Sequence, residues 1–268
     1  MKETAERGSQ AASEIHTARV CGLPVAVIDY EGAVKQIEEW AMNGNEVRAV
    51  SAANTHVAAH SRRVESFGAA MSQFDLICPD GMPLVWAVNR QLPQEERLND
   101  RVYGPNLMLA SIKASRSNPA VRHFFFGGKE STLAKLEERF EKDWPEATIT
   151  GSYSPPFGEW PEDEFERICE KIRESGANVI WVGLGCPKQE QWIGDHKDKL
   201  PPGVYLAVGA AFAFHAGEVS QAPKFLQRIG MEWAYRLMME PRRLFKRYFV
   251  NNRLFLQYWI TDMVKNRG

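Results

Sequence analysis

The stretch "NVIWVGLGCPKQEQWI", residues 178–193, decides how this 268-residue chain can fold. Its apolar run, Val179 to Val182, leads into a turn with two glycines, and a polar, helix-like run follows Pro187. A strand, a short turn and a helix form the repeating unit of a parallel α/β sheet. Turns of this kind also hold phosphate groups on the N–H groups of the helix. The stretch therefore predicts one unit of the fold and raises the question of a nucleotide ligand.

The same alternation of strand-like and helix-like runs continues along the chain. "VRAVSAAN" precedes a helix expected at about residues 56–73, "FDLICPDG" precedes one at about 82–89, and "VYLAVGAAFAF" closes the series as a strand. "KESTLAKLEERFEKDW" places Leu133, Leu136 and Phe140 on one helical face. We predict an α/β fold, a Rossmann-like parallel sheet flanked by helices, with ligands beyond the carboxyl ends of its strands.

Length and composition describe an ordinary globular protein with three segments. Hydrophobic residues make up 44% of the chain and charged residues 25%, which excludes the disordered and collagen-like classes. We predict a disordered polar tail at residues 1–19, a Rossmann-like α/β domain at 20–221 and a helical, basic appendage at 222–268. The four cysteines form no CxxC pair, which argues against a zinc ribbon or a disulfide scaffold. No signal peptide or membrane-spanning run is visible, so we expect a cytoplasmic protein that touches a membrane only from its surface.

The net charge of −1 is unevenly distributed. From residue 222 onward ten lysines and arginines stand against three acids, a net +7, so the rest of the chain carries −8. The acidic body argues against a dedicated nucleic-acid binder. The basic end suits contact with an anionic lipid surface.

The basic end is predicted to be helical throughout. In "APKFLQRIGMEWAYRLMME" charged residues recur at every fourth position: Lys224, Arg228, Glu232, Arg236 and Glu240. This ladder indicates a solvated helix face with i,i+4 ion pairs. Pro241 suits the first turn of a second helix, which carries a broad apolar stripe flanked by arginines. That second helix could pack on its own domain, join two copies as a homo-oligomer, or lie in a bilayer interface.

The turn at residues 183–187 fails the tests for two common phosphate loops. A dinucleotide fingerprint, GxGxxG, needs a third glycine where this chain has Lys188, and the GK[ST] ending of a Walker A loop is absent. What remains is a helix start with Lys188, Gln189, Glu190 and Gln191, whose N–H groups suit a phosphate or a sugar hydroxyl. An ordinary strand–helix turn with a solvated start explains the same residues.

Asp80 is the carboxylate best placed for chemistry. It follows an apolar strand and precedes Gly81, at a strand end where a carboxylate can face a ligand. There it could serve as a general base that takes a proton from an attacking hydroxyl. Helix capping by aspartate accounts for the same position.

Metal and nucleophile chemistry find little support in the sequence. His56 and His60 share a helix face, but the glutamate of HExxH and further ligands are missing. No DxD pair is present to hold a divalent ion on a nucleotide diphosphate, and no GxSxG elbow marks a hydrolase. Cys186 has no histidine at a recognisable spacing, so we interpret it as a small packing residue. We expect neither a metal nor a cofactor.

Several blocks of sequence, in a fixed order and spacing, resemble one family. They are "NTHVAAHSRR", "CPDGMPLVW", "RVYGPNL", "FFFGGKEST", "WVGLGCPKQEQWI" and the long run "AVGAAFAFHAGEVSQAPKFLQRIGMEWAYRLMMEPRRLFKRY". Over roughly residues 20–255 the chain resembles the WecG/TagA/CpsF glycosyltransferases, glycosyltransferase family 26. The resemblance implies an inverting, metal-independent transfer of a sugar from a UDP-sugar to a polyprenyl-diphosphate-linked saccharide. It also implies work at the inner face of the bacterial cell membrane, in the synthesis of a cell-surface polysaccharide.

The resemblance further implies roles for individual residues. Asp80 matches the aspartate proposed as general base, Gln189 a glutamine of the active-site pocket, Asn54 a polar residue at its mouth, and Arg101 an arginine with a diphosphate role. Arginines of the appendage match positions thought to close over the diphosphate and to reach the membrane: Arg228, Arg236, Arg242, Arg243 and Arg247. Further substrate contacts are expected at strand ends and in the turn: Thr55, Gly81, Gly128, Gly185, Pro187, Lys188 and Glu190.

The chain departs from the family pattern at a few positions. Ala52 stands where many relatives carry a threonine, so the hydroxyl contact is lost or moves to Ser51 or Thr55. Gln221 stands for an arginine, as in exopolysaccharide members, which favours a glucosyl-type donor. Two other classes stay open: a Rossmann-like nucleotide-binding oxidoreductase, which would need the complete GxGxxG, and a non-catalytic membrane-associated scaffold, which would not need Asp80.

Overall fold

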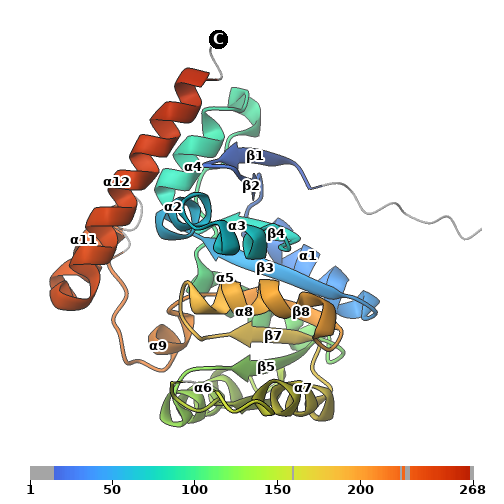
Figure 1. Cartoon of the computed structure of the whole chain (residues 1–268). Coiled ribbons are helices and arrows are strands. Elements are labelled where there is room, and N and C mark those ends of the chain that lie inside the picture. Colours follow the sequence, from blue (N-terminus) through green and yellow to red (C-terminus); the bar gives the residue numbers. More distant parts are fainter. Residues whose placement is uncertain (1–14, 159, 224, 227–229, 266–268) are drawn as a thin grey trace, which may run out of the picture.

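A parallel sheet forms the centre of the protein (Figure 1). The computed structural model describes residues 15–158, 160–223, 225–226 and 230–265. The sheet strands are β3 (Val47–Ala53), β4 (Leu76–Pro79), β5 (Arg122–Phe126), β6 (Thr148–Tyr153), β7 (Val179–Val182) and β8 (Gly203–Ala207). They lie in the order β4-β3-β8-β7-β5-β6, and every neighbouring pair is parallel. The predicted α/β fold with a Rossmann-like parallel sheet is confirmed.

The apolar run of β7 is explained by burial on both faces of the sheet. Successive side chains of a strand point to opposite faces. Val179 and Trp181 accordingly enter one core cluster, while Ile180 and Val182 enter the other. All four side chains are fully buried, and burial of such a side chain contributes roughly 1.5–3 kcal/mol. A strand covered on both sides has no polar face to show in its sequence.

Helices cover both faces of the sheet. One core cluster takes its helical side chains from α1 (Tyr30–Asn43), α5 (Gly104–Ala114), α6 (Glu130–Asp143) and α9 (Ala211–His215). The other takes them mainly from α2 (Thr55–Arg63), α3 (Glu65–Met71), α4 (Met82–Asn89), α7 (Glu164–Ser175) and α8 (Lys188–His196). Short 3₁₀ turns lie at η1 (Gln94–Glu96), η2 (Ser115–Ser117) and η3 (Lys197–Lys199). The predicted apolar face of α6, with Leu133, Leu136 and Phe140, is buried as expected.

Two predicted elements are broken by the structure. The helix expected at residues 56–73 is two helices, because Val64 leaves the helical region (φ −116°, ψ 109°) between α2 and α3. The bend lets α3 dock closely on α8, where a Cβ on Gly194 would lie 2.5 Å from the Ala70 carbonyl oxygen. The last apolar run is a strand only as far as Ala207. Gly209 then turns the chain at φ +63°, and α9 follows.

A hairpin precedes the parallel sheet and corrects the predicted N-terminal tail. β1 (Thr17–Val20) pairs antiparallel with β2 (Leu23–Ala26) through a two-residue turn, Cys21 and Gly22, both at positive φ. The tail predicted at residues 1–19 therefore ends too late, because Thr17 to Arg19 belong to β1. Their alternate side chains pack into the core that α4 shares. Residues 1–14 of that tail lie outside the described residues.

The basic end forms two described helices, α11 (Glu232–Met239) and α12 (Pro241–Lys265), and Pro241 starts the second as predicted. One side of α12 packs on its own body beside α2 (Figure 1). Thr55 Oγ1 donates to Asn252 Oδ1 at 2.7 Å, Arg62 Nη1 lies 2.7 Å from Asp262 Oδ1, and Phe255 is buried in the core. The other side of α12 exposes apolar side chains: Phe245, Phe249, Leu256, Ile260 and Val264. Within the described residues, no helix combines the length and apolar character that a membrane span needs.

Candidate active site

Several of the predicted site residues lie where the parallel strands end. Asn54 follows β3, Asp80 follows β4, and Gly183 follows β7, so all three lie at the carboxyl edge of the sheet. α11 reaches the same edge through a buried contact with Arg101, which lies in the loop before α5. Ligands of open α/β sheets bind at this edge. The location agrees with the expectation from the sequence.

Asp80 is held firmly at this edge. Its Oδ1 accepts a hydrogen bond from the Gly104 N–H at 2.7 Å. A Cβ at position 104 would lie 2.7 Å from the Val208 carbonyl oxygen, so only glycine lets that N–H come so close. Burial raises the pKa of Asp80 from 3.8 to about 6, although Arg101 and the Gly104 N–H lower it. The carboxyl therefore exchanges a proton near neutral pH, as a general base must.

Asn54 joins the start of α2 to Asp80. Its Oδ1 accepts hydrogen bonds from the N–H groups of His56 (3.0 Å) and Val57 (3.4 Å), which caps α2. A hydrogen bond from the Asn54 side chain also lowers the pKa of Asp80. The amide thus uses its oxygen for the helix and faces the carboxyl with its nitrogen.

Arg101 forms a buried ion pair that the sequence did not indicate. Its Nη2 contacts Glu232 Oε2 of α11, and the two residues are only 7% and 6% exposed. Its Nη1 lies 3.4 Å from the Asp80 carbonyl oxygen, and its guanidinium lies 4.3 Å from the centre of the Tyr103 ring. The predicted solvated ladder is therefore wrong for Glu232, whose carboxylate faces the body of the protein because a buried guanidinium neutralises it there.

Arg236 lies one helical turn beyond Glu232 on α11. Its guanidinium lies over the Phe214 ring, 5.4 Å from the ring centre, and its buried Nε has no hydrogen-bond partner among the described residues. Arg242 is exposed in the first turn of α12. Arg228 lies outside the described residues, as do the side chains of Arg243 and Arg247.

The Gln189 side chain stabilises the turn at residues 183–187. Its Oε1 accepts from the Gly185 N–H at 3.1 Å, and its Nε2 donates to Glu190 Oε1 at 3.0 Å. Gly185 has φ +80° and open space beside it, whereas Gln189 is 1% exposed. Pro187 precedes α8, and Lys188 is exposed on its first turn. The turn is thus built by Gln189, while Gly185 and Lys188 form its accessible part.

Glu190 is a buried carboxyl near the half-buried Asp80. Its side chain is 1% exposed, and its Oε2 has no hydrogen-bond partner among the described residues. Burial raises the pKa of Glu190 to about 7, against hydrogen bonds from Gln189 and Cys186 that lower it, and the Asp80 charge raises it further. The two carboxyls therefore disfavour each other's ionisation.

Cys186 has a histidine neighbour after all. Its Sγ lies 3.5 Å from His56 Nδ1, across 130 positions of sequence, so the spacing hid this histidine, while Cys186 also packs against the core as expected. The His56 and His60 rings lie 5.7 Å apart on α2, as their spacing indicated. Among the residues that the structure describes, no three His, Cys, Asp or Glu side chains form a group suited to a metal ion.

The remaining predicted contacts are divided between site and scaffold. Gly81 starts α4, and a Cβ there would lie 3.8 Å from Asn54 Cβ. Gly128 is exposed at the end of β5, with φ +78°. Thr55 is half-buried and its hydroxyl donates to Asn252 of α12, whereas Ser51 is fully buried.

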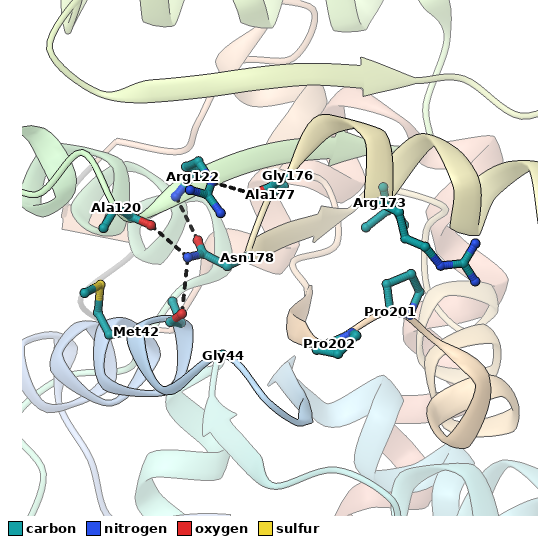
Figure 2. A pocket seen from close by; sticks show the side chains of 12 residues that line it. Met42, Gly44, Ala120, Arg122, Arg173, Gly176, Ala177, Asn178, Pro201 and Pro202 are labelled. Atoms are coloured by element: carbon teal, nitrogen blue, oxygen red, sulfur yellow. Dashed lines mark hydrogen bonds between the residues drawn. The ribbon is translucent and has the colours of Figure 1, made fainter.

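Two cavities differ in their relation to this edge. One of about 460 Å³ lies at the opposite, amino edge, around Asn178 (Figure 2). There Arg122 donates through Nε to the Gly176 carbonyl oxygen at the end of α7, which is a helix-capping role. A smaller cavity of about 210 Å³ adjoins Arg101 and is lined by residues 97–101 with Asp29 and Tyr30. The larger cavity therefore lies at the other edge of the sheet from the carboxyls of Asp80 and Glu190.

Sequence reasoning missed two residues of the site, Gly104 and Glu232. Gly104 acts through its backbone N–H and a close approach, which a residue pattern shows only as a lone glycine before proline. Glu232 occupied a regular position in a charge ladder, and nothing in its spacing marked it as different. In both cases the signal lies in a contact between distant segments.

The comparison with known families agrees with this geometry. The sequence profile of the glycosyl transferase WecG/TagA/CpsF family matches residues 18–268, nearly the whole chain, including α11 and α12. The match covers the carboxyl edge, the turn before α8 and the helices α11 and α12. The chain therefore belongs to the WecG/TagA/CpsF glycosyltransferase family.

Proposed function

We propose that this protein transfers a sugar from a UDP-sugar to a polyprenyl-diphosphate-linked saccharide, with inversion and without a divalent metal. The product would enter a bacterial cell-surface polysaccharide of the exopolysaccharide, teichoic acid or enterobacterial-antigen type. The observation that carries the proposal is the Asp80 carboxyl at the carboxyl edge of the sheet: it accepts a hydrogen bond from the Gly104 N–H, and burial raises its pKa to about 6. Membership of a glycosyltransferase family supports it.

In the proposed reaction Asp80 is the general base. As the acceptor hydroxyl oxygen forms a bond to the anomeric carbon, its proton passes to Asp80. The bond between that carbon and the β-phosphate oxygen breaks on the opposite face, and UDP leaves with the electron pair. A positioned base of this kind contributes roughly 10²–10⁴-fold in rate.

The negative charge that develops on the β-phosphate needs cationic partners. Arg236 is suited to this role because its buried Nε has no partner among the described residues, and Arg101 lies beside Asp80. The N–H groups at the start of α8 and the exposed Lys188 can add to them. These groups take the place of a divalent ion, for which the sequence has no DxD pair. The accessible part of the turn, at Gly185, leaves space for the UDP-sugar.

The test is a transfer assay on the full chain. A panel of UDP-sugars that includes glucosyl-type donors is incubated with a short polyprenyl-diphosphate saccharide, in EDTA and in Mg²⁺, and the products are weighed by mass spectrometry. We expect one donor to add a single sugar at equal rates in both buffers. No transfer from any donor would overturn the activity, and a strict need for Mg²⁺ would overturn the metal-free mechanism.

Peripheral binding at the inner face of the cell membrane is the second part of the proposal. The exposed apolar side of α12 and its basic flank suit an anionic bilayer surface. We expect the protein to sediment with vesicles of anionic phospholipid, and Phe249→Ser with Ile260→Ser to release it. Met42→Ser removes an apolar side chain of similar exposure far from α12 and serves as control. A stable dimer in solution that these serines dissociate would instead assign the surface to a homo-oligomer.

A further inference from the structure

Glu232 connects α11 to the active site through charge. It contacts Arg101 Nη2, while Arg101 Nη1 lies 3.4 Å from the carbonyl oxygen of Asp80. Both partners are more than nine-tenths buried. The contacts Glu232–Arg101 and Arg101–Asp80 thus join a helix of the basic end to the residue of the proposed base, the first of them across 131 positions of sequence.

We propose that Glu232 is a positioning residue of this active site: its carboxylate fixes the Arg101 guanidinium beside Asp80, so that docking of α11 completes the catalytic geometry. The inference rests on the proposed function and adds to it a residue whose effect passes through Arg101. Bound in this way, the guanidinium has one nitrogen on Glu232 and another on the main-chain carbonyl oxygen of Asp80.

The charge of Glu232 also acts on Asp80. Arg101 lowers the pKa of Asp80, and Glu232 raises it. Other titratable groups face the same carboxyl from every side: Cys78 on β4, Tyr30 on α1, Tyr103 before α5 and Glu190 on α8. Two carboxylates of the described residues thus interact with Asp80: Glu190 belongs to α8, and Glu232 belongs to the basic end. The proton affinity of the base therefore depends on whether α11 is docked.

If Glu232 only docked the basic end on the body, a second ion pair between the same two parts would have the same role. Asp262 of α12 and Arg62 of α2 form one, with both side chains 29% exposed and an Nη1–Oδ1 distance of 2.7 Å. This pair joins the same basic end to the same body, away from Arg101. Asp262→Asn is therefore a matched control for Glu232→Gln, since each change keeps the size of the side chain and removes one carboxylate charge.

The experiment measures the Asp80 carboxyl directly in the full chain. The ¹³C signal of its side chain is assigned by its loss in Asp80→Asn and titrated between pH 4 and 9 without substrate. We expect Glu232→Gln to lower the pKa of Asp80 by about one unit, the low end of the range for a nearby charge. Glu232→Asp restores the charge and should return the pKa toward that of the unaltered protein. Asp262→Asn should leave it unchanged.

Transfer kinetics supply the second measurement. In Glu232→Gln the acid limb of the kcat profile should move to lower pH with the Asp80 titration, and the plateau should fall by roughly 10–100-fold, as for a misplaced catalytic group. Equal effects of Glu232→Gln and Asp262→Asn, or an unmoved Asp80 pKa in Glu232→Gln, would reduce Glu232 to a docking contact. The titration needs no substrate, so absence of transfer in the unaltered protein would overturn the proposed function and leave this test intact.

Discussion

The two edges of the parallel sheet are built for different purposes. At the amino edge a cavity of about 460 Å³ is bounded by polar groups that bond one another, with Asn178 at its centre (Figure 2). At the carboxyl edge Glu190 is buried and Asp80 is half-buried, both carboxyls have raised pKa values, and Arg101 lies beside Asp80. Perturbed titration in a buried cluster is a better guide to chemistry than the volume of a cavity.

The two edges differ because they receive opposite ends of the helices, whose free polar groups need different partners. The amino edge receives the carbonyl ends of α1 and α7, and Asn178 and Arg122 bond those carbonyl oxygens. The carboxyl edge receives the N–H ends of α2, α5 and α8, which attract negative charge. Carboxylates and anionic ligands are therefore stabilised at one edge and arginine caps at the other.

The largest effect on activity is expected for Asp80→Asn at the carboxyl edge. We expect transfer to fall by roughly 10²–10⁴-fold, because an amide cannot take the proton of the acceptor hydroxyl. Steady-state kinetics with the UDP-sugar found in the panel would measure the loss. Turnover within a few-fold of the unaltered protein would remove Asp80 from the base role.

The same variant has a built-in control for folding. The pKa of Asp80 in the fold, about 6, exceeds its ordinary value of 3.8. The stability that this carboxyl contributes is therefore fully present below pH 3.8 and lost as the pH rises through about 6. In Asp80→Asn the amide oxygen still accepts from the Gly104 N–H, but the side chain carries no charge. The Tm of this variant at pH 8 should therefore equal or exceed that of the unaltered protein.

Arg236→Ala tests the cationic part of the carboxyl edge. We expect kcat to fall by roughly 10²–10³-fold, the usual cost of removing one preorganised group from a developing charge. Arg253→Ala, an exposed arginine of α12, is the matched control and should retain full activity in a vesicle-free assay. Similar losses in both variants would point to general weakening of the basic end.

The pH dependence of transfer should report the Asp80 carboxyl. Because its pKa is raised to about 6, mainly by burial, the base is neutralised as the pH falls below that value. We expect kcat to decrease roughly tenfold per unit below it. A rate that stays constant from pH 5 to 7 would show that no group of this pKa must be ionised.

The smallest effect on activity is expected at the amino edge. Asn178→Ala removes hydrogen bonds to Ala41, Ala120 and Arg122 at 3.2, 2.8 and 2.8 Å. It should lower the free energy of unfolding by roughly 1–3 kcal/mol. At 25 °C kcat/KM should stay unchanged, as checked by urea unfolding and kinetics on one preparation. A specific loss of kcat would overturn the division between the two edges.

Much of the site could be predicted because its residues follow strands. Asp80 and Asn54 each come directly after an apolar run, and carboxyl ends of parallel strands meet at one edge. Partners could not be predicted in the same way. The Gln189 amide oxygen accepts from the Gly185 N–H and Arg101 pairs with Glu232, contacts that no residue pattern showed; the substrate roles of both residues stay predictions.

Local sequence patterns specify the secondary-structure units of this protein. Apolar runs, glycine turns and amphipathic helices depend on neighbours a few residues apart, so β7, the turn after it and α8 could be predicted from one stretch. The contacts that the side chains make depend instead on how the chain folds in three dimensions. Glu232 reaches Arg101 over 131 positions, Cys186 reaches His56 over 130, and Gly104 reaches Asp80 over 24. Such contacts form when the sheet brings strand ends together, and burial there changes the proton affinity of carboxyls that look ordinary in the sequence.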